Sequence, residues 1–338
     1  MAFTVLRTAA GSPVAPFVIK ALKQIPDVRV VAVDCDPLSC GFAFADRHYA
    51  VPRVDAAGFL DAMLEICRQE SVDLLLPDLD EELGLLSAAQ DRFLALGTRV
   101  VVSAPDAISE CADKHRTFRL FRSRGIPTPE TWLPEEVDGE ALKFPVIVKP
   151  RSGRGSSGVF RAEGPEELEY SLARVTKPII QEFVDGVEYT IDTMSDLEGN
   201  FLYCSVRQRL ATDSGISIKG RTVVHAGIAE FARRIVEALP IVGPGCVQGI
   251  EGTEGIKFTE INPRLAGGAP LSIAAGAPIL TDLVRLARGD RATGPAVYRA
   301  NLLMLRFWED VFVDEKSWNA RDGQPAASLR DETARRLL

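Results

Sequence analysis

Long apolar segments are absent from the 338-residue sequence, and no run approaches the roughly 18 residues that a membrane span needs. The N-terminal residues enter an apolar stretch, Phe3–Leu6, without the basic start and cleavage site of a secretory signal. Histidine is scarce, and the three histidines lie far apart, so no histidine-based metal cluster or catalytic triad is evident. We therefore expect a cytoplasmic protein with no membrane partner.

Paired cysteines are also missing, because the six cysteines are dispersed and no two form a C-x-x-C motif. This pattern disfavours a structural zinc site and fits reduced thiols in a cytoplasmic protein. Basic residues are outnumbered, with 39 Lys and Arg against 47 Asp and Glu and a formal net charge of −8. The acidic balance argues against nucleic-acid binding, so an anionic ligand would need a local cluster of Lys and Arg.

Apolar strand-like runs, such as Val28–Val33 and Asp73–Pro77, alternate with helical patterns along the first third of the chain. The alternation predicts an α/β fold with a parallel, doubly wound sheet, in which ligands bind beyond the carboxyl ends of strands. One of its helices is expected from Glu81 to Leu96. Helix capping would explain Asp34 and Asp78 as well as ligand binding does. The polar groups expected at this edge are the Ala9–Ser12 turn, Asp34, Asp36, Asp78, Asp80, Glu81 and Ser103.

A loop rich in Gly and Ser, residues 151–158, follows the apolar run Pro145–Val148 and Lys149. The ammonium group of Lys149 is expected at the mouth of the strand. Glycines let backbone N–H groups approach a ligand closely, and the serine hydroxyls add donors, so the loop can cradle phosphate oxygens. The spacing matches neither the Walker A pattern nor G-x-G-x-x-G. An ordinary flexible hairpin would have a similar composition.

Glu260 and Asn262 stand two residues apart at the end of a predicted strand, so their side chains point to the same face. With Gln248 from the preceding strand they offer oxygen ligands, which Mg²⁺ prefers. Arg264 beside them could neutralise a transferring phosphoryl group or an oxyanion. A strand end with a hydrogen-bonded turn is the alternative interpretation.

Two further segments carry weaker signals. The segment Gln181–Glu188 could offer backbone groups to an adenine edge, with Glu188 accepting from ribose hydroxyls, although its composition alone favours a plain β-hairpin with exposed acids. Arg207, Arg209 and Lys219 bracket a polar stretch and suggest an anionic substrate, with a solvated basic face as the alternative.

In their order along the chain, these segments resemble the motifs of the ATP-grasp superfamily. The matching segments are Asp113-Lys114, VIVKP at 146–150, IIQEFVDGVEYTID at 179–192, and VQGIEG with KFTEINPR between 247 and 264. The resemblance looks strongest to the carbamoyl-phosphate-synthase-large-subunit-like group, in single-module form. It implies an α/β pre-ATP-grasp domain with a parallel sheet, followed by α+β lid and C-terminal domains. The implied boundaries are 1–112 for the N-terminal Rossmann-like domain, 113–140 for a helical linker, 141–194 for the lid, 195–314 for the C-terminal domain and 315–338 for a charged tail.

The resemblance also implies roles for individual residues, which are expectations at this point. The implied Mg²⁺ ligands, which Mn²⁺ could share, are Gln248, Glu260 and Asn262. Substrate contacts are implied for Arg207, Arg209, Lys219 and Arg264, with Arg207, Lys219 and Arg264 also catalytic. The implied ATP-binding residues are Lys114, Lys149, Ser152, Gly153, Arg154, Gly155, Ser156, Ser157, Glu182, Phe183, Val184 and Glu188.

The implied reaction is the ligation of a small-molecule carboxylate to an amine or another nucleophile. ATP phosphorylates the carboxylate, the nucleophile attacks the acylphosphate, and ADP and phosphate are released. A homodimer is expected by analogy. Two alternatives share the ATP motifs: a nucleotide-binding module or complex subunit without turnover, and an ATP-dependent kinase of a small molecule.

Overall fold

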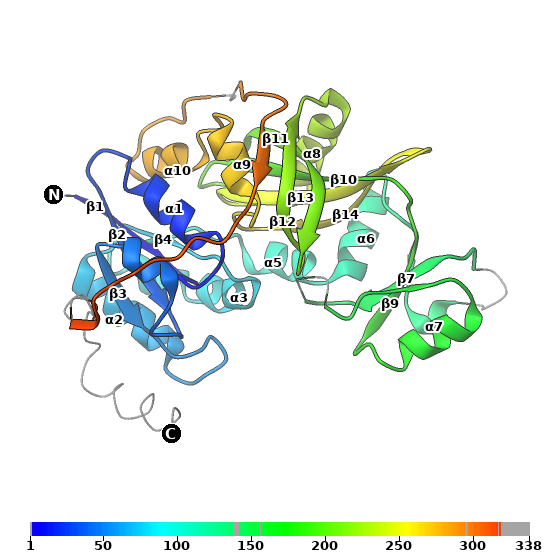
Figure 1. Cartoon of the computed structure of the whole chain (residues 1–338), viewed down its shortest axis with the longest axis horizontal. Coiled ribbons are helices and arrows are strands. Elements are labelled where there is room, and N and C mark those ends of the chain that lie inside the picture. Colours follow the sequence, from blue (N-terminus) through cyan, green and yellow to red (C-terminus); the bar gives the residue numbers. More distant parts are fainter. Residues whose placement is uncertain are drawn as a thin grey trace. The chain divides into compact units, whose positions relative to one another are not determined.

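The computed structural model describes residues 2–137, 142–153, 155, 157–294, 297–316 and 318. The chain divides into two compact units (Figure 1). Met1–Pro105, Pro278–Thr293 and Phe307–Leu338 form the first, and Asp106–Ala277 and Gly294–Arg306 form the second. Among the described residues, no helix combines the length and apolarity that a membrane crossing requires.

The first unit is built on a five-stranded parallel sheet with strand order β3-β2-β1-β4-β5. The central strand pairs Val5 with Val30 on one side and with Leu74 on the other. These strands read as apolar runs because both faces of a parallel sheet are covered. The predicted α/β class with a parallel N-terminal sheet is confirmed. The strands are β1 (Phe3–Arg7), β2 (Val28–Asp34), β3 (Arg47–Ala50), β4 (Leu74–Leu76) and β5 (Arg99–Val100).

Helices from two distant parts of the sequence accompany this sheet. The single helix predicted from Glu81 to Leu96 was wrong, because the chain leaves helical geometry at Ala89 and forms two helices. Contacts on both sides of the break tie it in place, since Ser87 Oγ donates to the Ser103 carbonyl and Gln90 Nε2 to the Val102 carbonyl. The helices are α1 (Ala15–Leu22), the 3₁₀ turn η1 (Cys40–Phe44), α2 (Phe59–Glu70), α3 (Asp80–Ala88), α4 (Gln90–Leu94) and, from late in the chain, α10 (Ile279–Ala287).

The second unit contains a four-stranded antiparallel sheet with strand order β6-β9-β7-β8. One helix, α7 (Pro165–Leu172), packs on β7 and β8 (Figure 1). Val148 and Ile180 are buried between sheet and helix as the centre of a small apolar core. The strands are β6 (Thr131–Trp132), β7 (Val146–Pro150), β8 (Phe160–Ala162) and β9 (Pro178–Glu182).

The larger sheet of the second unit has six antiparallel strands in the order β14-β13-β10-β11-β12-β15. Its apolar core includes Ile191, Val247 and Ile261, which are fully buried beneath α8. The strands are β10 (Val187–Ser195), β11 (Phe201–Asp213), β12 (Ile216–Val223), β13 (Pro244–Gly252), β14 (Gly255–Asn262) and β15 (Leu303–Leu305). The helices are α5 (Pro105–Ala112), α6 (Lys114–Ser123), η2 (Pro134–Glu136), α8 (Ala226–Ala238) and α9 (Ala269–Ala274).

Candidate functional site

Lys149 lies near the end of β7 in the second unit, where the neighbouring strand supports its side chain. Its Nζ donates to Gln181 Oε1 on β9 at 2.8 Å. Burial lowers the pKa of Lys149 to about 8, the negative charge of Glu260 opposes this fall, and the positive charge of Lys114 adds to it. The charges of a second predicted ATP-binding lysine and of a predicted metal ligand therefore act on Lys149.

The glycine-rich loop after β7 is tied to the start of α6. Asp113 caps this helix by accepting from the backbone N–H groups of His115 and Arg116, and it pairs with Arg151 at 2.7 Å. Lys114 Nζ donates to the Gly153 carbonyl at 2.8 Å. These contacts join the Asp113-Lys114 segment to the loop that begins at Arg151, 37 positions after Lys114.

Glycine is required in this loop because its backbone enters left-handed conformations. The φ angles are +123° at Gly153, +71° at Gly155 and +69° at Gly158, which L side chains rarely adopt. Ser152 and Ser157 are exposed, as a loop that covers a ligand would require. The predicted ligands Arg154 and Ser156 lie outside the described residues.

Three predicted metal ligands lie on adjacent strands β13 and β14. Gln248 and Glu260 are cross-strand partners, and Asn262 Nδ2 donates to Glu260 Oε1 at 3.3 Å. One carboxylate and two amide oxygens suit Mg²⁺, which accepts few protein ligands and completes its shell with phosphate oxygens and water. Among the described residues no group of three His, Cys, Asp or Glu could hold a metal, so a cation here would depend on the amides.

Arg209 links this ligand set to the predicted ribose ligand. Its Nη1 donates to Gln248 Oε1 at 3.0 Å and lies 3.4 Å from Glu188 Oε2, while its Nη2 donates to the Gly215 carbonyl. Gln248 Oε1 and Glu188 Oε2 are thereby joined through one guanidinium group.

The segment predicted to contact adenine begins at Glu182, which makes an ion pair and a backbone hydrogen bond. Glu182 Oε1 pairs with Lys257 Nζ at 2.5 Å, and Glu182 N donates to the Glu130 carbonyl at 2.8 Å. The Phe183 ring lies under the Arg161 guanidinium at 4.2 Å. Val184 follows at the point where β9 has ended, and it is half-buried.

Arg207 is placed differently from the other predicted substrate ligands, because it is 1% exposed. It binds Asp192 through two hydrogen bonds, Nε to Oδ2 at 2.6 Å and Nη2 to Oδ1 at 2.8 Å. Ser272 Oγ also donates to Asp192 Oδ2. A Cβ atom at Gly268 would lie 2.3 Å from Arg207 Nη1, so this glycine lets the backbone pass over the guanidinium. In this structure Arg207 therefore forms a buried ion pair with Asp192.

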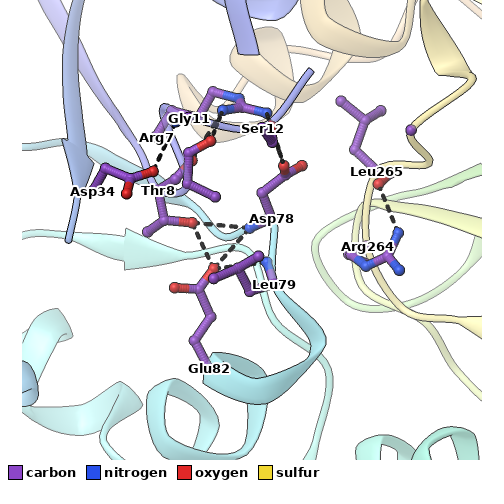
Figure 2. Close-up of polar contacts among 12 residues, drawn as sticks. Arg7, Thr8, Gly11, Ser12, Asp34, Asp78, Leu79, Glu82, Arg264 and Leu265 are labelled. Carbon is purple, nitrogen blue, oxygen red and sulfur yellow. Dashed lines mark hydrogen bonds and ion pairs between the residues drawn. The ribbon is translucent and has the colours of Figure 1, made fainter. Parts of the chain in front are cut away.

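The remaining two predicted substrate ligands lie near the same sheet. Lys219 is exposed on β12, and Arg264 is half-buried with Nη1 donating to the Leu265 carbonyl at 3.2 Å (Figure 2). Lys219 thus presents its ammonium group to solvent, whereas the Arg264 guanidinium is hydrogen-bonded after the end of β14.

In the first unit, a polar cluster occupies the carboxyl edge of the parallel sheet at β1 and β4 (Figure 2). The Arg7 guanidinium, 1% exposed, donates through Nη1 to the Thr8 and Ala9 carbonyls and through Nη2 to Asp78 Oδ2 at 2.9 Å. Ser12 Oγ donates to the same Asp78 oxygen at 3.0 Å. The β1 turn is thereby held against the end of β4, at the point where strand order reverses and α/β sheets bind ligands.

The Ala9–Ser12 turn, Asp34 and Asp78 were expected at this edge from the sequence, whereas Arg7 and Glu82 were not. Asp34 Oδ2 accepts from Gly11 N at 2.7 Å, which joins a third strand to the cluster. Arg7 could have been noticed in the sequence, because it is a basic residue directly after the apolar run Phe3–Leu6. Lys149 follows the apolar run Pro145–Val148 in the same way. Glu82 carried no such signal, because an acid in the first turn of a helix is ordinary.

Glu82 is the buried acid of this cluster, and its Oε1 accepts from Thr8 Oγ1, Asp78 N and Leu79 N. Burial raises the pKa of Glu82 to about 7, and the hydrogen bonds oppose the rise. The folded protein therefore binds more protons than the unfolded chain between the ordinary glutamate pKa and about 7. Stability from this group is complete at low pH and falls as pH rises through that window.

We expect Glu82→Gln, which keeps an oxygen acceptor but cannot ionise, to remove this pH dependence. At pH 8 the variant should be more stable than the parent by up to about 3 kcal/mol, whereas near pH 4 the two should be equal. Urea unfolding at both pH values measures the difference. A variant that is destabilised by the same amount at both pH values would contradict a buried, protonated Glu82.

Two models of known protein families match successive parts of the chain. Residues 7–101 match the model described as "PylC-like, N-terminal domain", and residues 111–268 match the model described as "ATP-grasp domain". The chain therefore contains an ATP-grasp domain that follows a PylC-like N-terminal domain. It is 27% identical over 288 residues to the carbamoyl phosphate synthase large chain of Clostridium beijerinckii, covering 78% of this chain and 26% of that protein. It is also 33% identical over 114 residues to the D-alanine--D-alanine ligase of Fusobacterium nucleatum, covering 34% and 38% of the two chains.

Solved structures show the same fold for this ATP-grasp chain. The N5-carboxyaminoimidazole ribonucleotide synthetase of Thermotoga maritima has a TM-score of 0.66 at 20% identity, covering 87% of this chain and 77% of that one. The L-amino acid ligase of Bacillus licheniformis has a TM-score of 0.67 at 17% identity, covering 84% and 74%. Because the chain spans only 26% to 38% of the curated relatives named above, their activities do not transfer directly.

Proposed function

We propose that this protein is an ATP-dependent, Mg²⁺-dependent carboxylate–amine ligase that works through an acylphosphate and releases ADP and phosphate. The observation that carries the proposal is the proximity of Lys149, Lys114 and Glu260, whose charges influence the Lys149 ammonium. Two cations at a glycine-rich loop beside a carboxylate and two amides match the needs of a metal-bound triphosphate. The D-alanine--D-alanine ligase and L-amino acid ligase named above support the choice of carboxylate and amine as substrates.

In the proposed mechanism, Gln248, Glu260 and Asn262 would hold Mg²⁺, which when bound neutralises charge on the phosphate oxygens. Lys149 and Lys114 add positive charge at the phosphate chain, and the N–H groups of the loop 152–158 enclose it. Glu182, Phe183 and Val184 line the adenine, and Glu188 accepts from the ribose hydroxyls. The adenine and ribose contacts position the nucleotide, and the other groups stabilise the charge of the transferred phosphoryl group. Positioning and charge stabilisation are most of what phosphoryl transfer requires of a protein.

Arg264, Arg209 and Lys219 are the proposed groups for the acylphosphate and the carboxylate substrate, because guanidinium groups bind carboxylate and phosphate with paired hydrogen bonds. Arg207 is proposed to act with them only through the nitrogen that Asp192 leaves unused. The domain limits given from the sequence, a cytoplasmic location and a homodimer belong to the same proposal. Support for the dimer is that the biotin carboxylase domain of the Hydrogenobacter thermophilus 2-oxoglutarate carboxylase, with a TM-score of 0.72, is described as a dimer.

The test is a phosphate-release screen with Mg-ATP in which candidate carboxylates are paired with amino acids and other amines. We expect phosphate release that requires both members of a pair, with one amide product formed per ADP. Omission of Mg²⁺ should abolish the signal. A stable phosphorylated product that needs no amine would identify a kinase instead, and ATP binding without release for any pair would identify a non-catalytic nucleotide-binding module.

A further inference from the structure

A surface pocket of about 420 Å³ lies between α6 and the β6 strand of the second unit, and none of the residues that line it was assigned a role in the proposed function. This volume is in the range of small-molecule sites, which measure a few hundred to about 1,000 Å³. Its lining includes two aromatic residues, Phe118 and Trp132. The pocket therefore offers apolar surface of a kind that packs against a flat ring.

Charged groups surround these rings, and most of them are already paired. Arg122 Nη1 lies 2.9 Å from Glu130 Oε2, and His115 Nε2 lies 3.4 Å from Glu136 Oε2. Arg119 also lines the pocket, and within the part of the chain that the structure describes it has neither an ion pair nor a hydrogen bond. One unpaired guanidinium beside two rings suits a ligand with a single carboxylate on an aromatic body.

The β6 wall of the pocket is connected to Lys149 by two hydrogen bonds. Thr131 is buried, and its Oγ1 donates to the Pro129 carbonyl at 3.0 Å and accepts from Gln181 Nε2 at 2.8 Å. The other end of the same amide accepts from Lys149 Nζ at 2.8 Å. The opposite wall is α6, whose first residue is Lys114. A shift of either wall thus reaches a lysine of the proposed ATP site.

We propose that this pocket binds a small aromatic monocarboxylate, whose carboxylate pairs with Arg119 and whose ring packs on Trp132 and Phe118, and that the occupant changes the affinity for ATP. Binding to the pocket stands on its own residues. The effect on ATP rests on the proposed function, because it assumes that Lys149 contacts the nucleotide.

Binding is measured by the fluorescence of Trp132. The chain has three tryptophans, so Trp308→Phe with Trp318→Phe leaves Trp132 as the single emitter. We expect 3-phenylpropanoate to quench it saturably and the neutral 3-phenylpropanamide to bind at least about tenfold more weakly, since the charge pair is missing. Arg119→Gln should weaken the carboxylate by a similar factor. Arg124→Gln, which removes the same charge from an exposed position outside the pocket lining, should leave the affinity unchanged.

Two results would overturn the assignment of the pocket. One is no saturable quenching up to about 10 mM carboxylate, and the other is equal binding by the acid and its amide or by the Arg119 and Arg124 variants.

Coupling is measured as the dissociation constant of Mg-ATP with and without saturating 3-phenylpropanoate. We expect a change of at least about threefold, and ATP should change the affinity for the carboxylate by the same factor. Thr131→Val keeps the shape of the side chain but removes the hydroxyl, so it should retain carboxylate binding and lose the effect on ATP. An ATP affinity that ignores a bound carboxylate overturns the coupling. Failure of the protein to bind ATP at all would refute the proposed function, while the Trp132 titration would still decide the pocket.

Discussion

Glu260→Ala is expected to lower ATP turnover by at least about a thousandfold without loss of the fold. The side chain is half-buried at the end of β14, accepts from Asn262 Nδ2, and is the negative charge that opposes the fall in the Lys149 pKa. Alanine would remove the one carboxylate from the proposed metal ligands and leave two cations without an opposing charge. Phosphate release at saturating Mg-ATP with the best substrate pair measures the loss. Lys149→Ala should give a comparable loss.

Glu254→Ala is the matched control, because this carboxylate stands in the turn of the same hairpin and is 81% exposed. It makes one ion pair, with Lys257 at 3.5 Å, and an exposed pair of this kind contributes little. The control should keep parental turnover, and both variants should keep the parental melting temperature and circular dichroism. Near-parental ADP release by Glu260→Ala would show that the strand ends do not form the catalytic site.

The α/β class could be predicted from the sequence because the buried parts of parallel strands, such as Val30–Val33 in β2, are uninterrupted apolar runs. The association of segments that lie far apart in the sequence could not be predicted in this way. The helix Ile279–Ala287 has an ordinary amphipathic pattern, which shows that one face is covered but does not show which sheet covers it. Its grouping with the first unit depends on tertiary contacts, such as Arg288 Nη2 donating to the Pro26 carbonyl.

Some side-chain contacts of the candidate site could be predicted from residue spacing, whereas others depend on tertiary packing. Glu260 and Asn262 share a face because strand side chains alternate, so their contact was predictable. Arg207 and Arg209 share a face of β11 by the same rule. Arg207 is nevertheless almost fully buried, with only 1% exposed, and it forms an ion pair with Asp192 on the neighbouring strand. The alternation of side chains predicts on which face of the strand Arg207 lies. It does not predict that the Gly268 backbone covers the guanidinium.

Asp192→Ala is expected to be the most destabilising single substitution in the second unit, with a loss of about 3–5 kcal/mol. It would leave the Arg207 guanidinium buried without its two hydrogen-bonded acceptors and Ser272 Oγ without its acceptor. Urea unfolding followed by circular dichroism measures the loss. Asp213→Ala, which removes an exposed carboxylate from the end of the adjacent strand β11, should change stability by less than about 0.5 kcal/mol.

The double variant Asp192→Leu with Arg207→Met distinguishes a buried charge that has lost its partner from a pair that is itself strongly stabilising. Because two ions must be desolvated to form the pair, replacing both by apolar side chains should restore much of the stability that Asp192→Ala loses. If the double variant also loses phosphate release while regaining stability, then Arg207 contributes to catalysis through its remaining nitrogen. If the double variant is no more stable than Asp192→Ala, the loss reflects general disruption of the core rather than an unpaired guanidinium.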